Sequence, residues 1–193
     1  MNRTKTRDQL IRVGSEIIAQ QGFNTAGINA VLSRAGVPKG SFYYYFTSKE
    51  DFGLAVIDDF AAQYSVQLDG ILENAQFSPL RRLRNYFDAG ILDMETCQCT
   101  RGCLIGNLCQ ELSAQNEVFR ARIDQVFEGW EQRLVQCLEA ARKAGEIDPN
   151  SDPAALGEFI LSGWEGSILR AKVTKSVEPM RTFARILFEK VLR

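Results

Sequence analysis

The sequence predicts an all-α fold of about nine helices, with a helix-turn-helix three-helix headpiece followed by a C-terminal helical ligand-binding and dimerisation domain. Apolar residues recur at spacings of three and four along most of the chain, which is the period of an amphipathic helix. Glycine and proline interrupt this pattern where helices are expected to end and begin. No segment shows the alternation of a strand, an internal repeat or low complexity. We place the two domains at residues 1–48 and 49–193.

The first fifty residues predict three helices and the start of a fourth. The apolar stripe of the first helix consists of Leu10, Ile11, Gly14, Ile17 and Ile18, and Gly22 ends this helix. The second helix carries Ile28, Val31, Leu32 and Ala35 and ends at Gly36. Pro38 opens a very short third helix over 38–45, because its fixed φ suits a first helical turn. Ser48 caps the fourth helix, which continues to about Glu73.

The remaining helices are longer. Pro79 opens the fifth helix, and a cysteine-rich break over 97–102 leads into a short apolar segment over 103–112. A long amphipathic helix follows, with the stripe Phe119, Ile123, Val126, Phe127, Trp130, Leu134, Leu138 and Ala141. Asp152 as N-cap and Pro153 as first helical residue begin the last pair of helices, over about 153–173 and 178–192.

Composition excludes several classes of function. The chain has no histidine, which removes histidine-based triads and most zinc sites. It also lacks a glycine loop for phosphate and a nucleophile motif, so we expect neither an enzyme nor a cofactor. No run approaches the length of a membrane-spanning helix, and no apolar region follows the basic N-terminus as in a secretory signal. The odd number of cysteines, five, without an export signal predicts reduced thiols in the cytoplasm.

Charge is distributed unevenly along the chain. Residues 1–50 hold seven basic and three acidic side chains, a balance of +4, so the remainder carries −5 of the net charge of −1. A basic end on an acidic body fits a module that meets the phosphates of double-stranded DNA. The alternative is a solvated basic face without a partner.

The segment 25–50 has the organisation of a helix-turn-helix, in which two short helices flank 35–38 and the second helix enters the major groove of DNA. Val37, Phe42 and Phe46 are predicted to face the core. The outer positions are then Lys39, Gly40, Ser41, Tyr43 and Tyr44. Tyrosine hydroxyls reach phosphates, and a glycine lets the backbone approach DNA closely. Lys49, in the first turn of the next helix, is placed to hold a phosphate together with backbone amides.

The run from Gly36 to Phe46, GVPKGSFYYYF, then Ser48-Lys49-Glu50, with Gly22-Phe23 and Thr25 before it, resembles the DNA-binding signature of the TetR family of bacterial repressors. Tyr45 departs from the pattern, where histidine is frequent, but tyrosine can still donate to phosphate. The resemblance implies that Thr25 and Tyr45 join the DNA-contacting residues. It also implies an omega-shaped homodimer that pairs through residues 153–192, with a ligand pocket in the later helices.

Small residues support this pairing independently, since they allow close helix packing: Ala154, Ala155, Gly157, Ser162, Gly163 and Gly166. Packing within one chain is the alternative. Trp130 and Trp164 are candidates to line the ligand pocket, and the alternative is that they are core residues.

Two further stretches, 101–105 (RGCLI) and 171–179 (AKVTKSVEP), resemble the repressors of the N-ethylmaleimide reductase type, which respond to electrophiles. Cys103 follows Arg101 and Gly102 at the predicted start of a helix, where the helix dipole favours a thiolate. The resemblance places Lys172 near this anion. Cys97, Cys99 and Cys109 could resolve a sulfenic acid at Cys103. The alternatives are that Cys103 is a small buried hydrophobe, or that 97, 99 and 103 hold a metal at a spacing unusual for zinc.

The sequence therefore predicts a sequence-specific DNA-binding transcriptional regulator, a repressor released from its operator by a small-molecule inducer or by thiol modification. The alternative is a helical interaction or adaptor protein without DNA function. The basic headpiece with Lys39, Tyr43 and Tyr44 argues against that alternative.

Overall fold

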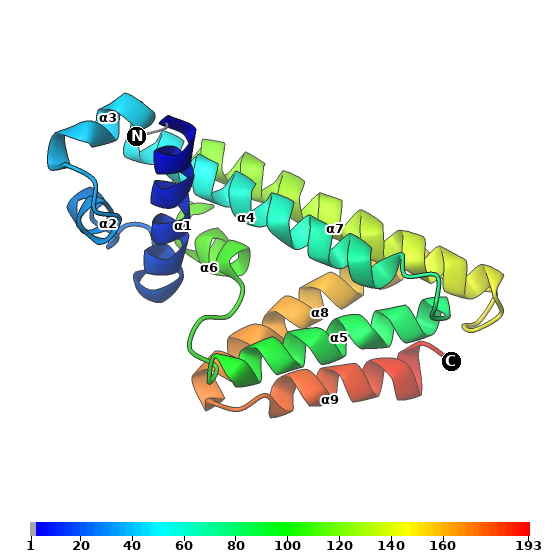
Figure 1. Ribbon diagram of the computed structural model, residues 1–193. Helices are drawn as coiled ribbons and strands as arrows, with labels where there is room; N and C mark the ends of the chain where they lie inside the picture. Colours follow the sequence, from blue (N-terminus) through cyan, green and yellow to red (C-terminus); the bar gives the residue numbers. More distant parts are fainter. Residues whose placement is uncertain (1–2) are drawn as a thin grey trace. The chain divides into compact units, whose positions relative to one another are not determined.

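The computed structural model describes residues 3–193, which form nine α-helices and no strand (Figure 1). The helices are α1 (Arg3–Gln21), α2 (Ile28–Arg34), α3 (Phe42–Tyr45), α4 (Lys49–Leu72), α5 (Pro79–Thr96), α6 (Leu104–Leu112), α7 (Glu117–Lys143), α8 (Pro153–Thr174) and α9 (Glu178–Ile186). The predicted all-α fold is thereby confirmed. Met1 and Asn2, which belong to the predicted headpiece 1–48, lie outside the described residues.

The predicted helix starts have the expected chemistry. The Ser48 hydroxyl accepts a hydrogen bond from the Asp51 N–H at 2.9 Å, and so caps α4. The Asp152 carboxylate accepts the N–H groups of Ala154 and Ala155 at 3.0 and 3.3 Å at the start of α8. Proline occupies the first turn of α5 and of α8, where its missing N–H leaves no acceptor unpaired.

Two predicted helices differ in detail from the structure. The segment 38–45 was expected as one helix, but Lys39–Ser41 is a 3₁₀ turn (η1), and the single α-turn α3 follows it. Short segments commonly take this tighter form, because a helix of so few residues gains little from propagation. The last helix, predicted over 178–192, ends at Ile186 and continues as the π-helical turn η2, Leu187–Val191.

The described residues group into two compact units. The first contains the described residues up to Gln63 together with Cys103–Asp124, and so combines α1 to α3, the first part of α4, α6 and the start of α7. The second contains Tyr64–Gly102 and Gln125–Arg193, with α5, α8 and α9 and the remaining parts of α4 and α7. The predicted sequence boundary between residues 48 and 49 stays a prediction.

The core of the first unit is built from the residues that the helix-turn-helix pattern assigned to it. Val37, Phe42 and Phe46 are all buried, as predicted. The Phe52 ring packs edge-on against the rings of Phe42 and Phe46, with centroids 5.6 and 5.0 Å apart. This cluster holds η1 and α3 at a fixed angle, and the aromatic pairs add to what their burial contributes.

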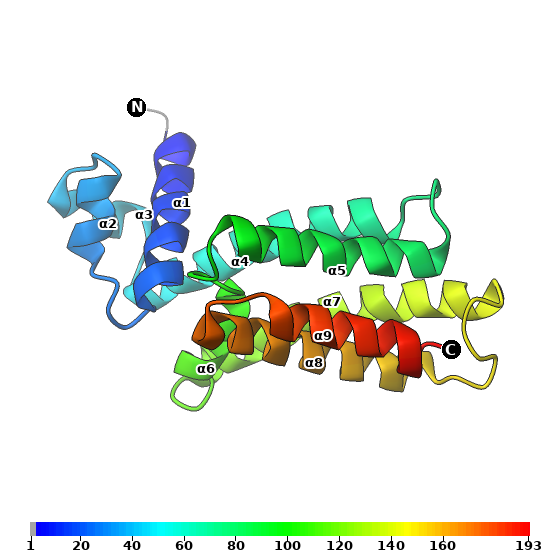
Figure 2. The ribbon, with the colours of Figure 1, turned by 90° about the horizontal axis from the view of Figure 1, so that it is seen from below.

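The core of the second unit is aromatic. The Trp164 ring lies 4.8 Å from that of Phe87 and 6.2 Å from that of Phe183, centroid to centroid, and both views show α8 beside α9 (Figures 1 and 2). A Cβ on Gly163 would lie 2.3 Å from the Phe183 ring, and a Cβ on Gly157 would lie 2.5 Å from Val135. These two small residues therefore serve packing within one chain, which was the alternative to dimer pairing.

Candidate functional site

The helix-turn-helix is fixed by hydrogen bonds within the turn and to α1. Gly36 has φ +65°, a left-handed conformation that costs glycine little. The Val37 N–H donates to the Leu32 carbonyl at 2.9 Å. The Gln9 side chain donates to the Ala35 carbonyl, also at 2.9 Å, and so bonds the turn to α1. The angle between α2 and the η1–α3 segment is therefore set by specific contacts.

The outer face of the η1–α3 segment carries the predicted DNA-contacting residues. Tyr43 and Tyr44 are 71% and 61% exposed, which is unusual for large aromatic side chains. Thr25, Lys39 and Gly40 are exposed, whereas Ser41 and Tyr45 are half-buried. The Arg3 guanidinium lies 4.7 Å from the centre of the Tyr44 ring. A Cβ on Gly40 would meet no other part of the chain. Aromatic and cationic groups thus share one solvent-facing surface.

Lys49 has a second role that the sequence did not reveal. Its Nζ donates to the Asn24 carbonyl at 3.1 Å and lies 4.8 Å from the centre of the Phe23 ring. The Phe23 ring in turn packs edge-on against Phe119 at 5.0 Å between centroids. Lys49 therefore ties the loop after α1 to the start of α4, in addition to its predicted part in DNA binding.

Helix α6 is bonded to the headpiece at one end and begins at a cysteine at the other. Cys103 is its N-cap, as predicted, and its sulfur accepts the Gly106 N–H at 3.3 Å. Near the C-terminal end, the two carboxylate oxygens of Glu111 accept the N–H groups of Phe23 and Asn24, both at 2.8 Å. A Cβ on Gly22, whose φ is +80°, would lie 2.8 Å from Glu111 Oε2. We call the two hydrogen bonds from Phe23 and Asn24 to Glu111 the Glu111 clamp. The sequence did not predict it, because no local pattern pairs residues so far apart in the chain.

The Cys97 thiol has a perturbed pKa. Partial burial raises the pKa of the Cys97 thiol, but hydrogen bonds from the backbone of Arg101 and Thr100 outweigh this effect, and the pKa lies below its ordinary value. The intervening Gln98 and Cys99 have φ of +52° and +53°, which turns the chain back toward Cys97. None of the five cysteines, all of which are described, is disulfide-bonded.

The two tryptophans are buried, as the core interpretation predicted, with 4% of Trp130 and 2% of Trp164 exposed. Trp130 packs against Tyr64 and Phe127 at 4.7 and 5.6 Å between ring centroids. Its indole Nε1 is buried without a hydrogen-bond partner. Leaving such a donor unpaired costs about 1–3 kcal/mol, so this N–H is an unexplained feature of the core.

Lys172 lies against the residue before Cys103 in the chain. A Cβ on Gly102 would be 2.7 Å from Lys172 Cδ, which shows how closely the lysine stem packs there. Within residues 3–193, no three side chains of the metal-ligating types come together as an ion site. No helix of the described part has the length and apolar character that crossing a membrane requires.

Comparison with known families identifies the class of protein. The model described as "Bacterial regulatory proteins, tetR family" matches residues 10–56, and "Tetracyclin repressor-like, C-terminal domain" matches residues 79–187. The chain belongs to the TetR family and is a DNA-binding transcriptional regulator rather than an enzyme. Regulators of this family bind DNA operators and small-molecule ligands and act as dimers.

Three relatives place the chain within the family. It is 40% identical to the transcriptional regulator AcuR of Cereibacter sphaeroides, over 91% of this chain and 80% of AcuR. It is 35% identical to the transcriptional repressor DhaR of a Mycobacterium species, over 100% and 95% of the two chains. It is 31% identical to the repressor NemR of Escherichia coli over 91% and 88%. The crystal structure of reduced NemR superposes with a TM-score of 0.91 over 98% of this chain and 97% of that one, at 29% identity. The predicted resemblance to the NemR-like branch is confirmed.

Proposed function

We propose that this regulator is a cytoplasmic repressor that leaves its operator when a small-molecule inducer binds or when Cys103 is chemically modified. The observation that carries the proposal is the construction of α6. This helix begins at the Cys103 sulfur and is bonded through Glu111 to the loop that precedes the helix-turn-helix.

Modification of Cys103 acts on this helix directly. Alkylation or oxidation of the sulfur weakens it as an acceptor for the Gly106 N–H and adds bulk at the first turn of α6. A displaced α6 moves the Glu111 carboxylate away from the N–H groups of Phe23 and Asn24. Lys172, whose stem packs on Gly102, stays a candidate residue of the proposed sensor.

The proposed DNA contacts divide by chemistry. Lys39 and Ser41, at the start of the η1–α3 segment, are proposed to read base edges in the major groove. Gly40 leaves space for the backbone to approach DNA. Phosphate contacts are proposed for the hydroxyls and the cation around this segment, of which Tyr45 and Lys49 are half-buried and the others exposed: Thr25, Tyr43, Tyr44, Tyr45 and Lys49.

The proposed inducer site uses the aromatic interior of the second unit. The buried, unpaired Nε1 of Trp130 is a donor that a ligand with a hydrogen-bond acceptor would satisfy. Tyr64 and Phe127 offer flat apolar faces beside it. Trp164 is proposed to shape the interior around the ligand. The inducer is therefore expected to be small and largely apolar, with a carbonyl or similar acceptor.

The proposed homodimer interface lies on α8 and α9, within residues 153–192. One stripe of α8 is solvent-exposed along its whole length and mixes large apolar with small residues: Phe159, Ser162, Gly166, Leu169 and Val173. Ile186 of α9 is also 40% exposed. A contiguous apolar stripe of this kind is typical of a helix-pairing surface.

The test is DNA release measured by fluorescence anisotropy, with duplex DNA from the region upstream of the regulator's own gene. N-ethylmaleimide or hypochlorite should release DNA from the wild type and from a Cys109→Ser control, but not from Cys103→Ser. Equal release from Cys103→Ser would remove Cys103 as the sensor and leave the inducer site as the route.

A further inference from the structure

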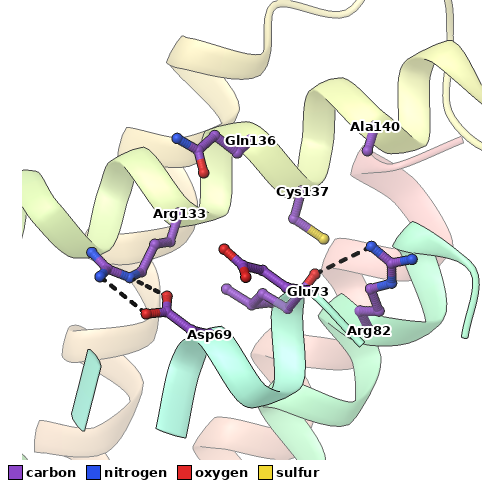
Figure 3. Close-up of a pocket in the computed structure, with 8 residues that line it drawn as sticks. Asp69, Glu73, Arg82, Arg133, Gln136, Cys137 and Ala140 are labelled. Carbon is purple, nitrogen blue, oxygen red and sulfur yellow. Dashed lines mark hydrogen bonds and ion pairs between the residues drawn. The ribbon is translucent and has the colours of Figure 1, made fainter. Parts of the chain in front are cut away.

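A hollow of about 170 Å³ lies in the second unit, separate from the aromatic interior (Figure 3). It is formed where the end of α4, the start of α5 and the C-terminal half of α7 meet. Its lining mixes polar and apolar groups and consists of Asp69, Leu72, Glu73, Arg82, Arg133, Gln136, Cys137 and Ala140. Charged side chains from three helices therefore surround one small space, and their pairing decides what the space can bind.

One acid–base pair in the lining is already complete. The Arg133 guanidinium binds the Asp69 carboxylate through two nitrogens, at 2.5 and 3.3 Å. The hydrogen bonds that Arg133 donates to Asp69 raise the pKa of Arg133; burial opposes this, and the charges of Asp69 and Glu73 add to it. Bidentate pairing uses the fork of the guanidinium fully. Arg133 and Asp69 therefore line the hollow as a neutral pair, and neither is expected to bind a charged group of a ligand.

Arg82 is held in place but carries a charge that no acid neutralises. Its Nε donates to the Phe77 carbonyl at 2.8 Å, and its Nη1 lies 3.5 Å from the Leu72 carbonyl. These neutral acceptors fix the guanidinium at the end of α4. Within residues 3–193, no carboxylate is at ion-pair distance from Arg82. Its remaining N–H groups form a pre-positioned site for a carboxylate.

Glu73 is the opposite case. Its carboxylate has no lysine or arginine at ion-pair distance among the described residues, although its charge acts on Arg133 at longer range. Figure 3 shows the Cys137 side chain pointing into the hollow between the Glu73 carboxylate and the Arg82 guanidinium. Burial raises the pKa of the Cys137 thiol to about 11, so at neutral pH this thiol is uncharged. It therefore neutralises neither of the two charged groups beside it.

We propose that this hollow binds a small zwitterion, with its ammonium group on Glu73 and its carboxylate on Arg82. A cavity of about 150 Å³ accommodates a molecule the size of benzene, so a hollow of 170 Å³ suits a short amino acid. Glu73 and Arg82, neither of which is in an ion pair within residues 3–193, have opposite charges and line the same space without pairing with each other. A ligand that carries both charges completes this arrangement. A simple anion or a simple amine would satisfy only one of them.

The experiment is isothermal titration calorimetry on the full chain without DNA, so its outcome is independent of the repressor proposal. The probes are glycine, β-alanine and γ-aminobutyrate, which carry the same two charges at increasing separation, and butyrate and butylamine, which each lack one charge. At least one zwitterion should bind, about tenfold or more tighter than butyrate or butylamine, which corresponds to about 1.4 kcal/mol. Failure of all three zwitterions to bind, or equal binding of butyrate, overturns the proposal.

Two variants locate the bound molecule. Glu73→Gln keeps the shape of an exposed side chain and should weaken binding of the same zwitterion about tenfold. Asp88→Asn removes an equally exposed carboxylate from α5 that does not line the hollow, and should bind like the wild type. Arg82→Lys keeps the cation while losing the fork, and should retain part of the affinity. Unchanged affinity in Glu73→Gln would place the ligand elsewhere and refute the assignment.

Discussion

The Glu111 clamp predicts that one side chain of α6 controls the stability of the headpiece. In Glu111→Ala, the N–H groups of Phe23 and Asn24 lose a charged acceptor that lies 2.8 Å from each. Hydrogen bonds to charged groups contribute about 1.5–3 kcal/mol each when protected, and less where water can replace the acceptor. Since one bond is part-buried and the other exposed, we expect a loss of about 2–3 kcal/mol in total.

That loss is measurable by thermal unfolding. For a chain of this size, each kcal/mol lowers the unfolding temperature by about 2–4 °C, so Glu111→Ala should unfold about 5–10 °C below the wild type. Glu111→Gln, which retains one acceptor oxygen, should lose about half as much. Gln110→Ala is the matched control: it removes a neighbouring exposed side chain that bonds only to Gly106 of its own helix, and should unfold within about 2 °C of the wild type.

A second measurement distinguishes the clamp from a general effect on stability. At a temperature where Glu111→Ala is folded, its affinity for operator DNA should be lower than that of the wild type, because the loop before the helix-turn-helix is less constrained. Modification of Cys103 should then change that affinity less than it does in the wild type. A Glu111→Ala protein that unfolds with the wild type and responds fully to modification would refute the reasoning.

Three further outcomes follow from the structure. Lys49→Ala should weaken DNA binding and flatten the dependence of log affinity on log salt by about one unit per subunit, whereas an unchanged slope would exclude a phosphate contact. Val173→Asp should yield monomers in sedimentation, whereas Val66→Asp, an equally exposed valine of α4, should remain dimeric; dimers in both would place the interface elsewhere. The pKa of Cys97 is lowered and that of Cys137 is raised to about 11. Because thiolates are the reactive form, iodoacetamide should label Cys97 faster than Cys137 at pH 7–8, and labelling of Cys137 should increase as the pH approaches about 11. Mass spectrometry that found Cys137 labelled before Cys97 would contradict both assignments.

Sequence patterns predicted the features that depend on local chemistry. The burial of Phe42 and Phe46, the exposure of Tyr43 and Tyr44 and the start of α6 at Cys103 all follow from helical period and capping rules. Each of these depends on residues within one or two turns. For the same reason the family signature, which is a contiguous string, sufficed to predict the fold.

The features that were missed depend on pairs distant in sequence. Glu111 bonds residues 88 and 87 positions away, and Lys49 reaches a carbonyl 25 positions away. Nothing in the composition of α6 identifies which acid makes such a bond. For Gly163 the sequence suggested a distant contact that the structure does not need. Its small size suggested a contact with a second subunit, but the Phe183 ring of the same chain fills the space beside Gly163. A charge at Gly163 would disrupt the subunit itself, so exposed Val173 is the better probe of dimerisation.

The strength of the clamp also limits how strongly α6 can regulate DNA binding. Modification of Cys103 can lower DNA affinity only by the free energy with which α6 favours the DNA-bound headpiece. For one subunit this free energy is at most the 2–3 kcal/mol assigned to Glu111, which corresponds to a loss of DNA affinity of about 30- to 150-fold. Shifting an equilibrium from almost fully bound to almost fully released requires about 5.5 kcal/mol. One headpiece cannot supply this through Glu111, but two headpieces of a dimer on one operator supply about 4–6 kcal/mol together. We therefore expect that a dimer modified at Cys103 on one subunit retains partial DNA binding, and that release becomes complete only when both subunits are modified.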